Sequence, residues 1–125
     1  MLPNKKQPER DERKKKKMKK NIMKVRQLEN KNQFIMENEK EVIFQSYDSI
    51  IAIINKTTKN LTLGCDWDYS RTTLKHLYIF LREYQYNLDY IEQHEILKAL
   101  QSNNTKKYIQ KLIDKKTIRY ESELI

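Results

Sequence analysis

The residues best suited to chemistry lie near the middle of the chain. Cys65, Asp66, Asp68 and His76 are close in sequence, and His94 follows; thiolate, imidazole and carboxylate groups are the usual protein ligands of zinc. Their spacing matches neither a paired CxxC nor an HxxxH pattern, either of which would favour a metal site. A nucleophile pair of Cys65 and His76 lacks a third group to orient the imidazole. The sequence therefore predicts no metal site, no cofactor and no catalytic residues, and we expect that the protein is not an enzyme.

Composition excludes several other classes of protein. Gly64 is the only glycine, which excludes the glycine-rich loops that hold phosphates in nucleotide-binding enzymes. The single cysteine excludes an internal disulfide and suits a reducing cytoplasm. The longest apolar run, Ile50–Ile54, is far too short to span a membrane, and no apolar stretch of a secretion signal follows the basic N-terminus. The expected location is the cytoplasm.

Positive charge is concentrated near the N-terminus. Of the net charge of +9, residues 1–20 carry ten Lys and Arg against three acidic residues, whereas residues 21–125 carry 16 against 14. Such a segment can contact phosphates by releasing counterions. The predicted contacts are Arg13, Lys14, Lys15, Lys16, Lys17, Lys19 and Lys20. Three alternatives remain open: a solubilising tail, an import signal in a eukaryotic cell, or a native start at Met18 or Met23.

A second basic cluster lies near the C-terminus. A helix, a short turn, a helix and a short strand form the outline of a helix-turn-helix with a rudimentary wing. Residues 105–119 hold six basic residues and one acidic residue. The predicted phosphate contacts are Lys106, Lys107, Gln110, Lys111, Lys115 and Arg119. The alternative interpretation is a packing helix whose lysines are merely solvated.

A third candidate surface lies on the central helix. Arg71, Lys75, Tyr78 and Arg82 follow one another at intervals of four, three and four residues, which predicts one helix edge. Three cations and an aromatic ring suit a nucleic-acid backbone and an exposed base. In the alternative, Tyr78 belongs to the core and the cations surround it.

The elements that position these residues can be read from hydrophobic periodicity. Residues 1–22 have almost nothing apolar to bury, so we expect a disordered tail followed by one α+β domain over residues 23–125. Short apolar runs between residues 23 and 63 predict an antiparallel meander of four or five strands. Phe34 and Met36 should share one face of their strand, and Ile50–Ile54 should form an inner strand buried on both faces. Gly64 should supply either a positive φ or a close backbone approach.

Three helices are predicted after the sheet, over about 71–84, 89–101 and 105–115. Ser70 is the expected N-cap of the first, Asp89 with Glu92 resembles a capping box for the second, and Thr105 is the expected cap of the third. The predicted apolar contacts are Leu74, Leu77, Tyr78, Leu81 and Tyr84 in the first helix and Ile91, Ile96, Leu97 and Leu100 in the second. Residues 117–120 alternate as a terminal strand or an extended tail would.

Two segments carry a resemblance to a known group of proteins. Residues 44–52 (FQSYDSIIA) and 67–76 (WDYSRTTLKH) resemble small uncharacterised proteins of phages, plasmids and other mobile elements, which have a YxSxIA strand and then a YSxTTxKH-like helix start. The resemblance implies a bacterial host cytoplasm, and it implies no settled activity.

The function expected from the sequence is accessory binding of nucleic acid, with DNA favoured over RNA, through the basic tail and the C-terminal lysine-rich helix. The alternative is a protein-interaction module that binds and modulates a host or phage protein without binding nucleic acid. In that case exposed tyrosines would form the interface, with Tyr84, Tyr86 and Tyr90 as candidates.

Overall fold

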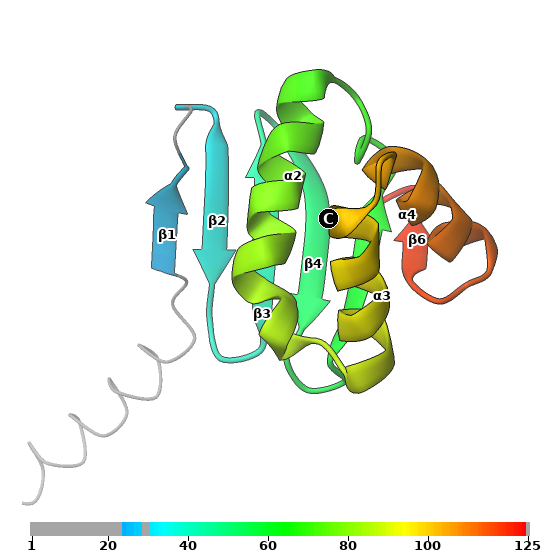
Figure 1. Ribbon diagram of the computed structural model, residues 1–125. Coiled ribbons are helices and arrows are strands. Elements are labelled where there is room, and N and C mark those ends of the chain that lie inside the picture. The colour runs from blue at the N-terminus through cyan, green and yellow to red at the C-terminus, as the bar shows by residue number, and fades with distance from the viewer. Residues whose placement is uncertain (1–23, 29–30, 125) are drawn as a thin grey trace, which may run out of the picture.

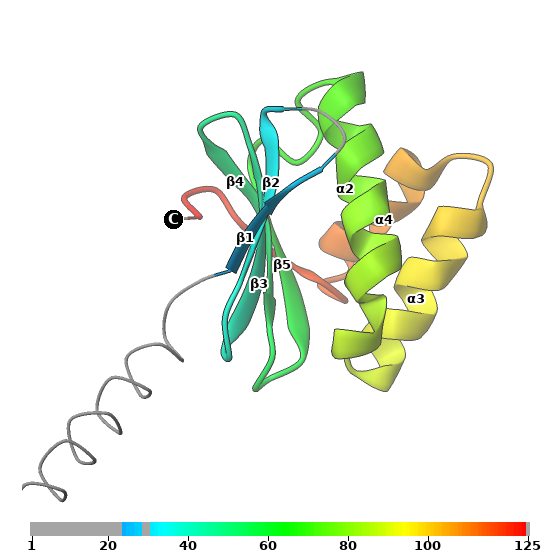
Figure 2. The same ribbon diagram turned by 90° about the vertical axis from the view of Figure 1, so that its left-hand side faces the viewer.

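A computed structural model describes residues 24–28 and 31–124 of the chain. These residues form an α+β fold in two layers, with a six-stranded sheet covered on one face by the helices (Figures 1 and 2). The predicted fold class is thereby confirmed. The predicted disorder of residues 1–22 lies outside the described residues. None of the described helices is long and apolar enough to cross a membrane.

The strands lie in the sheet in the same order as in the chain. The first five pair antiparallel with their neighbours and are β1 (Lys24–Gln27), β2 (Gln33–Glu37), β3 (Glu41–Ser46), β4 (Ser49–Asn55) and β5 (Asn60–Gly64). The predicted meander is therefore correct. The last strand, β6 (Arg119–Glu121), is parallel to β5, because the intervening helices return the chain to the edge of the sheet from the same end.

The strand register determines which side chains lie beneath the helices. Ile35 is opposite Phe44, Phe44 is opposite Ala52, and Ala52 is opposite Leu63, and all four are buried. Phe34 and Met36 share a face as predicted, but it is the half-buried face turned away from the helices. The prediction that β4 is buried on both faces is likewise only half right. Ile54 is buried, whereas Ile50 and Ile53 are only partly buried because the helices cover one face of the sheet.

The first helix, α2 (Arg71–Tyr84), packs across β3. Ser70 is its N-cap, as predicted: the Ser70 hydroxyl oxygen accepts a hydrogen bond from the backbone N–H of Thr73 at 3.1 Å. The buried stripe is rotated from the prediction, since Phe80 and His76 are buried, whereas Leu74 and Tyr78 only pack at its border. Phe80 stacks on Phe44 with ring centroids 5.7 Å apart, which joins the helix to the sheet.

The helix α3 (Tyr90–Gln101) follows a short 3₁₀ turn, η1 (Gln85–Asn87). Asp89 caps α3 as predicted, and its carboxylate accepts from the backbone N–H of Glu92 at 2.8 Å. The side chain of Glu92 turns to the sheet, where it accepts from the backbone N–H of Leu61 at 2.7 Å. The prediction of Ile91 as a core contact is wrong, because Ile91 is 65% exposed. It precedes Glu92 by one residue, which on an α-helix turns its side chain about 100° away from the face that buries Glu92, Ile96 and Ala99.

The last helix, α4 (Thr105–Asp114), is capped by Asn104 and not by Thr105 as predicted. The side-chain oxygen of Asn104 accepts a hydrogen bond from the backbone N–H of Lys107 at 3.1 Å. Thr105 is therefore the first residue of the helix and not its cap. At the other end Lys116 has a φ of 63°. Its N–H donates to the carbonyl of Ile113 and the N–H of Thr117 to that of Leu112, both at 2.9 Å, which is a Schellman motif.

The positive φ of Lys116 leads to a prediction about stability. A lysine in the left-handed region costs about 1–2 kcal/mol relative to right-handed helix, and glycine adopts this conformation freely. Lys116→Gly should therefore raise the free energy of unfolding by about 0.5–1 kcal/mol after glycine's greater loss of backbone entropy. Lys115→Gly is the matched control, since it removes the same charge at a position with a φ of −82° and should destabilise. Denaturant unfolding of both variants measures the difference, and equal destabilisation would contradict the prediction.

Gly64 ends β5, and the structure decides between the two predicted reasons for a glycine there. Its φ is not positive. A Cβ at this position would lie 2.7 Å from the carbonyl oxygen of Ile50 and 3.3 Å from the side chain of Leu124. Close backbone approach is therefore the reason. The contact with Leu124 fits the course of the chain after β6, which turns to the sheet face opposite the helices (Figure 2).

Candidate functional site

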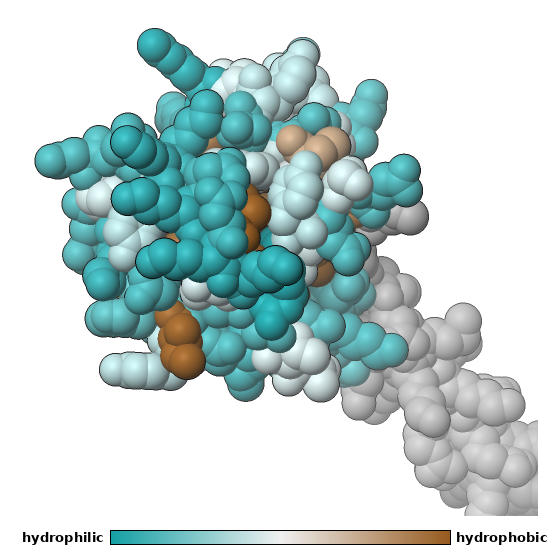
Figure 3. All heavy atoms as spheres, turned by 90° about the vertical axis from the view of Figure 1, so that its right-hand side faces the viewer, coloured by the Kyte–Doolittle hydropathy of each residue, from teal (hydrophilic) through white to brown (hydrophobic). Residues whose placement is uncertain are grey.

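The outer face of α4 carries a row of lysines. Lys107, Lys111 and Lys115 follow one another at intervals of four residues, are all exposed, and are called here the α4 lysine ridge. Their successive Cα positions lie about 6 Å apart along the helix axis. The opposite side of the helix buries Ile109 and Leu112 in the core. The ridge therefore points away from the domain, on the side of the molecule where the surface is largely hydrophilic (Figure 3).

The ridge is not neutralised by acidic side chains. Among the described residues, no ion pair within 4 Å involves any of the three lysines. The single acidic residue of the helix, Asp114, accepts a hydrogen bond from the side-chain amide of Gln110 at 3.0 Å. Gln110, predicted as a phosphate contact, thus shares its amide with Asp114. An uncompensated row of ammonium groups is an attractive surface for a polyanion.

The other basic residues predicted in this region make contacts within the domain. The ammonium group of Lys106 lies 3.8 Å from the carboxylate of Asp68, an ion pair at the surface. Arg119 donates to the buried carboxylate of Glu92 at 2.7 Å. The guanidinium of Arg119 therefore has a structural contact of its own, which distinguishes it from the lysines of the ridge.

The helix-turn-helix outline is only partly present. α3 and α4 are joined by a short turn and pack against one another, as predicted. The strand that follows them is β6, which pairs with β5 in the central sheet. It is therefore not a separate wing beside a reading helix.

On α2 the structure separates the cations from the aromatic ring. Arg71, Lys75 and Arg82 are exposed. Tyr78 is half-buried and packs against the core, so its ring is not a free stacking surface. Burial, and then the nearby negative charge of Asp68, raise the pKa of the Tyr78 hydroxyl above its ordinary value.

The basic residues predicted in the N-terminal segment, Arg13 to Lys17 with Lys19 and Lys20, lie outside the described residues. The structure therefore describes only the candidates on α2 and in the segment from α4 to β6. The contact between Lys106 and Asp68 connects the first turn of α4 with the loop that precedes α2.

Of the three tyrosines predicted to be exposed, Tyr86 and Tyr90 are exposed and Tyr84 is not. Tyr84 is buried, where it contacts the ring of Phe80 at a centroid distance of 5.4 Å. Tyr86 and Tyr90 are 64% and 82% exposed, and Ile91 beside them is exposed as well. These three residues, called here the α2–α3 patch, lie in η1 and in the first turn of α3.

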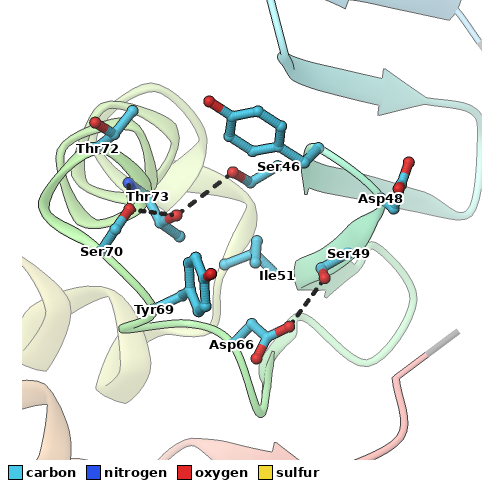
Figure 4. Close-up of a pocket in the computed structure, with 10 residues that line it drawn as sticks. Ser46, Asp48, Ser49, Ile51, Asp66, Tyr69, Ser70, Thr72 and Thr73 are labelled. Atoms are coloured by element: carbon cyan, nitrogen blue, oxygen red, sulfur yellow. Dashed lines mark hydrogen bonds between the residues drawn. The ribbon is translucent and has the colours of Figure 1, made fainter.

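The structure also contains a polar pocket that was not predicted. A hollow of about 560 Å³ lies between the β3–β4 turn, the β5–α2 loop and the first turn of α2. Its lining consists mainly of hydroxyl-bearing side chains and two carboxylates (Figure 4). The lining residues are Ser46, Tyr47, Asp48, Ser49, Ile51, Asp66, Tyr69, Ser70, Thr72 and Thr73.

Both segments with the mobile-element resemblance contribute to this pocket. Residues 46–49 and 51 come from the first segment, and residues 69, 70, 72 and 73 come from the second. The concentration of Ser, Thr and Tyr in these two short segments was the one feature of the sequence that could have indicated the pocket. It could not be used because nothing in the sequence states that a strand turn and a helix start about twenty residues apart face each other.

The residues considered as metal ligands or nucleophiles are not assembled into a site. His76 is buried, its Nδ1–H donates to the carbonyl of Thr72 at 2.8 Å, and its Nε2 has no hydrogen-bond partner among the described residues. Cys65 is exposed in the loop before α2. Within the described residues, no three His, Cys, Asp or Glu side chains are grouped so that they could hold a metal ion.

Comparison with known proteins gives a family but no activity. No curated protein and no solved structure matches the chain. The model of a family of unknown function, DUF8033, matches residues 13–98. The match runs from the basic N-terminal segment into α3, contains both segments that line the pocket, and ends before α4. Since the match covers more than half of the sequence, the chain belongs to the family of unknown function DUF8033.

Proposed function

We propose that the protein binds nucleic acid through phosphate contacts made by the α4 lysine ridge and the basic N-terminal segment. The observation that carries the proposal is the ridge itself: three evenly spaced, exposed lysines with no acidic partner among the described residues. The ridge is about 12 Å long, which corresponds to three or four phosphates along one strand of B-DNA. Arg71 and Arg82 on α2 are further candidates for backbone contacts.

DNA is the preferred partner in this proposal. The major groove of B-DNA is wide enough to admit a helix, whereas the major groove of A-form RNA is too narrow for its side chains to read. The resemblance of residues 44–52 and 67–76 to mobile-element proteins supports a role in the cytoplasm of a bacterial host. In that setting the protein is an accessory DNA-binding factor of a phage or plasmid.

The test is the salt dependence of binding. The full chain should bind duplex DNA with an affinity whose logarithm falls linearly with the logarithm of salt concentration, with a slope of about −0.9 for each phosphate contact. A variant with Lys14–Lys17, Lys19 and Lys20 changed to Gln measures the share of the N-terminal segment as the difference in slope. Fluorescence anisotropy with DNA and RNA duplexes of the same sequence gives both measurements. An affinity that does not change with salt would exclude the proposal.

A second candidate function is a protein-interaction module, and the α2–α3 patch favours it. Tyr86, Tyr90 and Ile91 expose large apolar side chains within six residues of the chain, and aromatic residues of this kind dominate binding at protein interfaces. Tyr90→Ser combined with Ile91→Lys should abolish capture of such a partner while leaving the fold intact. A partner retained by a variant of the lysine ridge and lost by this patch variant would support the interaction role. Equal capture by both variants would exclude the patch.

A further inference from the structure

The hydroxyl-lined pocket has the composition of a ligand site that is independent of the lysine ridge. Its wall combines seven hydroxyl groups with the carboxylates of Asp48 and Asp66. A hydroxyl group both donates and accepts hydrogen bonds, whereas an ionised carboxylate only accepts. The volume of about 560 Å³ falls in the usual range for sites that hold a small molecule.

The carboxylate of Asp66 is held in a defined orientation. Its Oδ2 accepts a hydrogen bond from the hydroxyl of Ser49 at 2.9 Å, which joins the β5–α2 loop to the start of β4 (Figure 4). The two oxygens of a carboxylate offer about four acceptor positions. Among the described residues, the only other side-chain contact of this carboxylate is with the thiol of Cys65, whose sulfur lies 3.7 Å from Oδ1. Asp66 therefore retains capacity to accept two donors from a ligand. Two hydroxyls on neighbouring carbon atoms match this arrangement.

The floor of the pocket has spare donors. The hydroxyl oxygens of Ser70 and Thr73 are 3.1 Å apart, and those of Thr73 and Ser46 are 3.5 Å apart (Figure 4). The three hydroxyl groups have three protons, and the two hydrogen bonds between them use two. At least one hydroxyl proton is therefore free to be donated to a ligand. Ser46 and Thr73 are buried, which makes an unused donor or acceptor there costly unless a ligand or water satisfies it.

A further unpaired polar side chain lies beside this floor. Gln33 is 0% exposed, and neither atom of its side-chain amide has a hydrogen-bond partner among the described residues. In the sheet register Gln33 is directly opposite Ser46, which lines the pocket. Leaving a buried amide unpaired costs about 1–3 kcal/mol for each donor or acceptor. A buried amide with unused donor and acceptor capacity therefore lies next to Ser46 at this end of the pocket.

Two tyrosines supply flat apolar surfaces at the pocket. Tyr47 and Tyr69 both line it and are largely exposed to solvent. Tyr47 is held at a φ of 54°, a conformation that is uncommon for a bulky side chain. An aromatic ring in this position can stack on the apolar face of a sugar ring or on a nucleobase.

The chemistry of the lining discriminates between ligand classes. Two carboxylates oppose an anion such as a free phosphate, and no three His, Cys, Asp or Glu side chains of the described residues are grouped so that they could hold a metal ion. A simple amine would use the carboxylates but would leave the hydroxyl groups without partners. We propose that this pocket binds a neutral ligand that presents a vicinal diol, as in the ribose of a ribonucleoside or in a hexose. Asp66 accepts from the diol, the Ser46–Thr73–Ser70 hydroxyls bond the ring oxygens, and Tyr69 stacks on the ligand.

The test is a binding titration of the full chain, followed by NMR or calorimetry, with adenosine, 2′-deoxyadenosine and a methyl hexoside. Adenosine or the hexoside should bind at micromolar to millimolar concentration. Loss of one hydroxyl in 2′-deoxyadenosine should weaken binding at least about tenfold relative to adenosine, the usual effect of a hydrogen bond to a charged group. Binding of adenosine alone identifies a nucleoside as the source of the diol, and binding of the hexoside alone identifies a glycan. Either result supports the proposal.

Two variants with matched controls complete the experiment. Asp66→Asn should weaken binding at least about tenfold, because it converts one acceptor oxygen into a donor amide, whereas Asp114→Asn on α4 should not. Tyr69→Ala should weaken binding, whereas Tyr86→Ala, at a similarly exposed site on the α2–α3 junction, should not. The proposal is overturned if none of the ligands binds at millimolar concentration, if adenosine binds and 2′-deoxyadenosine binds equally well, or if Asp66→Asn does not weaken binding of the ligand that binds. Failure here leaves the salt-dependent binding of DNA untouched, because the ridge lysines do not line the pocket.

Discussion

Changing Lys107, Lys111 and Lys115 together to Gln is expected to weaken binding of duplex DNA by the full chain on the order of a thousandfold at about 50 mM salt. The three side chains are exposed and have no acidic partner among the described residues, so each can release a counterion from a phosphate. Loss of three such contacts should also reduce the salt slope by about 3. Fluorescence anisotropy over a range of salt concentrations gives both values.

The control for this variant removes the same charge elsewhere. Lys24, Lys40 and Lys59 are exposed on the strands and turns of the sheet, and changing them to Gln also lowers the net charge from +9 to +6. If position on α4 matters, the control variant should keep most of the affinity. Equal losses in the two variants would mean that overall charge, and not the ridge, carries the binding. The fold of both variants is checked by circular dichroism.

The largest effect on stability is expected from Glu92. Its carboxylate is 3% exposed and accepts from the backbone N–H of Leu61 at 2.7 Å, from the side-chain amide of Asn60 at 2.8 Å and from Arg119 at 2.7 Å. Through these contacts one side chain of α3 holds β5 and β6 together. Glu92→Ala leaves a buried backbone donor unpaired and opens a cavity. We expect the free energy of unfolding to fall by about 3 kcal/mol, which corresponds to a melting temperature roughly 10–20 °C lower.

Two further variants separate the contributions at this site. Glu92→Gln keeps an acceptor for Leu61 but loses the charge opposite Arg119, so its cost should be about 1–2 kcal/mol. Arg119→Ala removes a half-exposed partner and leaves the two other donors in place, and it should cost no more than about 1 kcal/mol. Thermal and urea unfolding measure all three. A melting temperature of Glu92→Ala equal to that of the unchanged protein would show that α3 is held to the sheet by apolar packing alone.

Much of the fold follows from local patterns. The strand runs, the three helices and the caps at Ser70 and Asp89 were predicted correctly because each depends on residues within a few positions of one another. The errors occurred where neighbours in space decide. The run Ile50–Ile54 was predicted to be buried on both faces, but the helices cover one face of the sheet, so Ile50 and Ile53 are only partly buried. Ile91 is as apolar as a core residue, yet Glu92 takes the buried side of α3 because it meets the free N–H of Leu61.

The candidate sites divide in the same way. The sequence by itself determined the α4 lysine ridge, since an interval of four residues on an amphipathic helix places those side chains together on the exposed side. Only the tertiary structure decided that Arg119 is bound to Glu92, that β6 joins the central sheet, and that a strand turn and a helix start form one hydroxyl-lined pocket. Those arrangements join residues about twenty or more positions apart, and their geometry is fixed by strand register and helix packing, which no local pattern encodes.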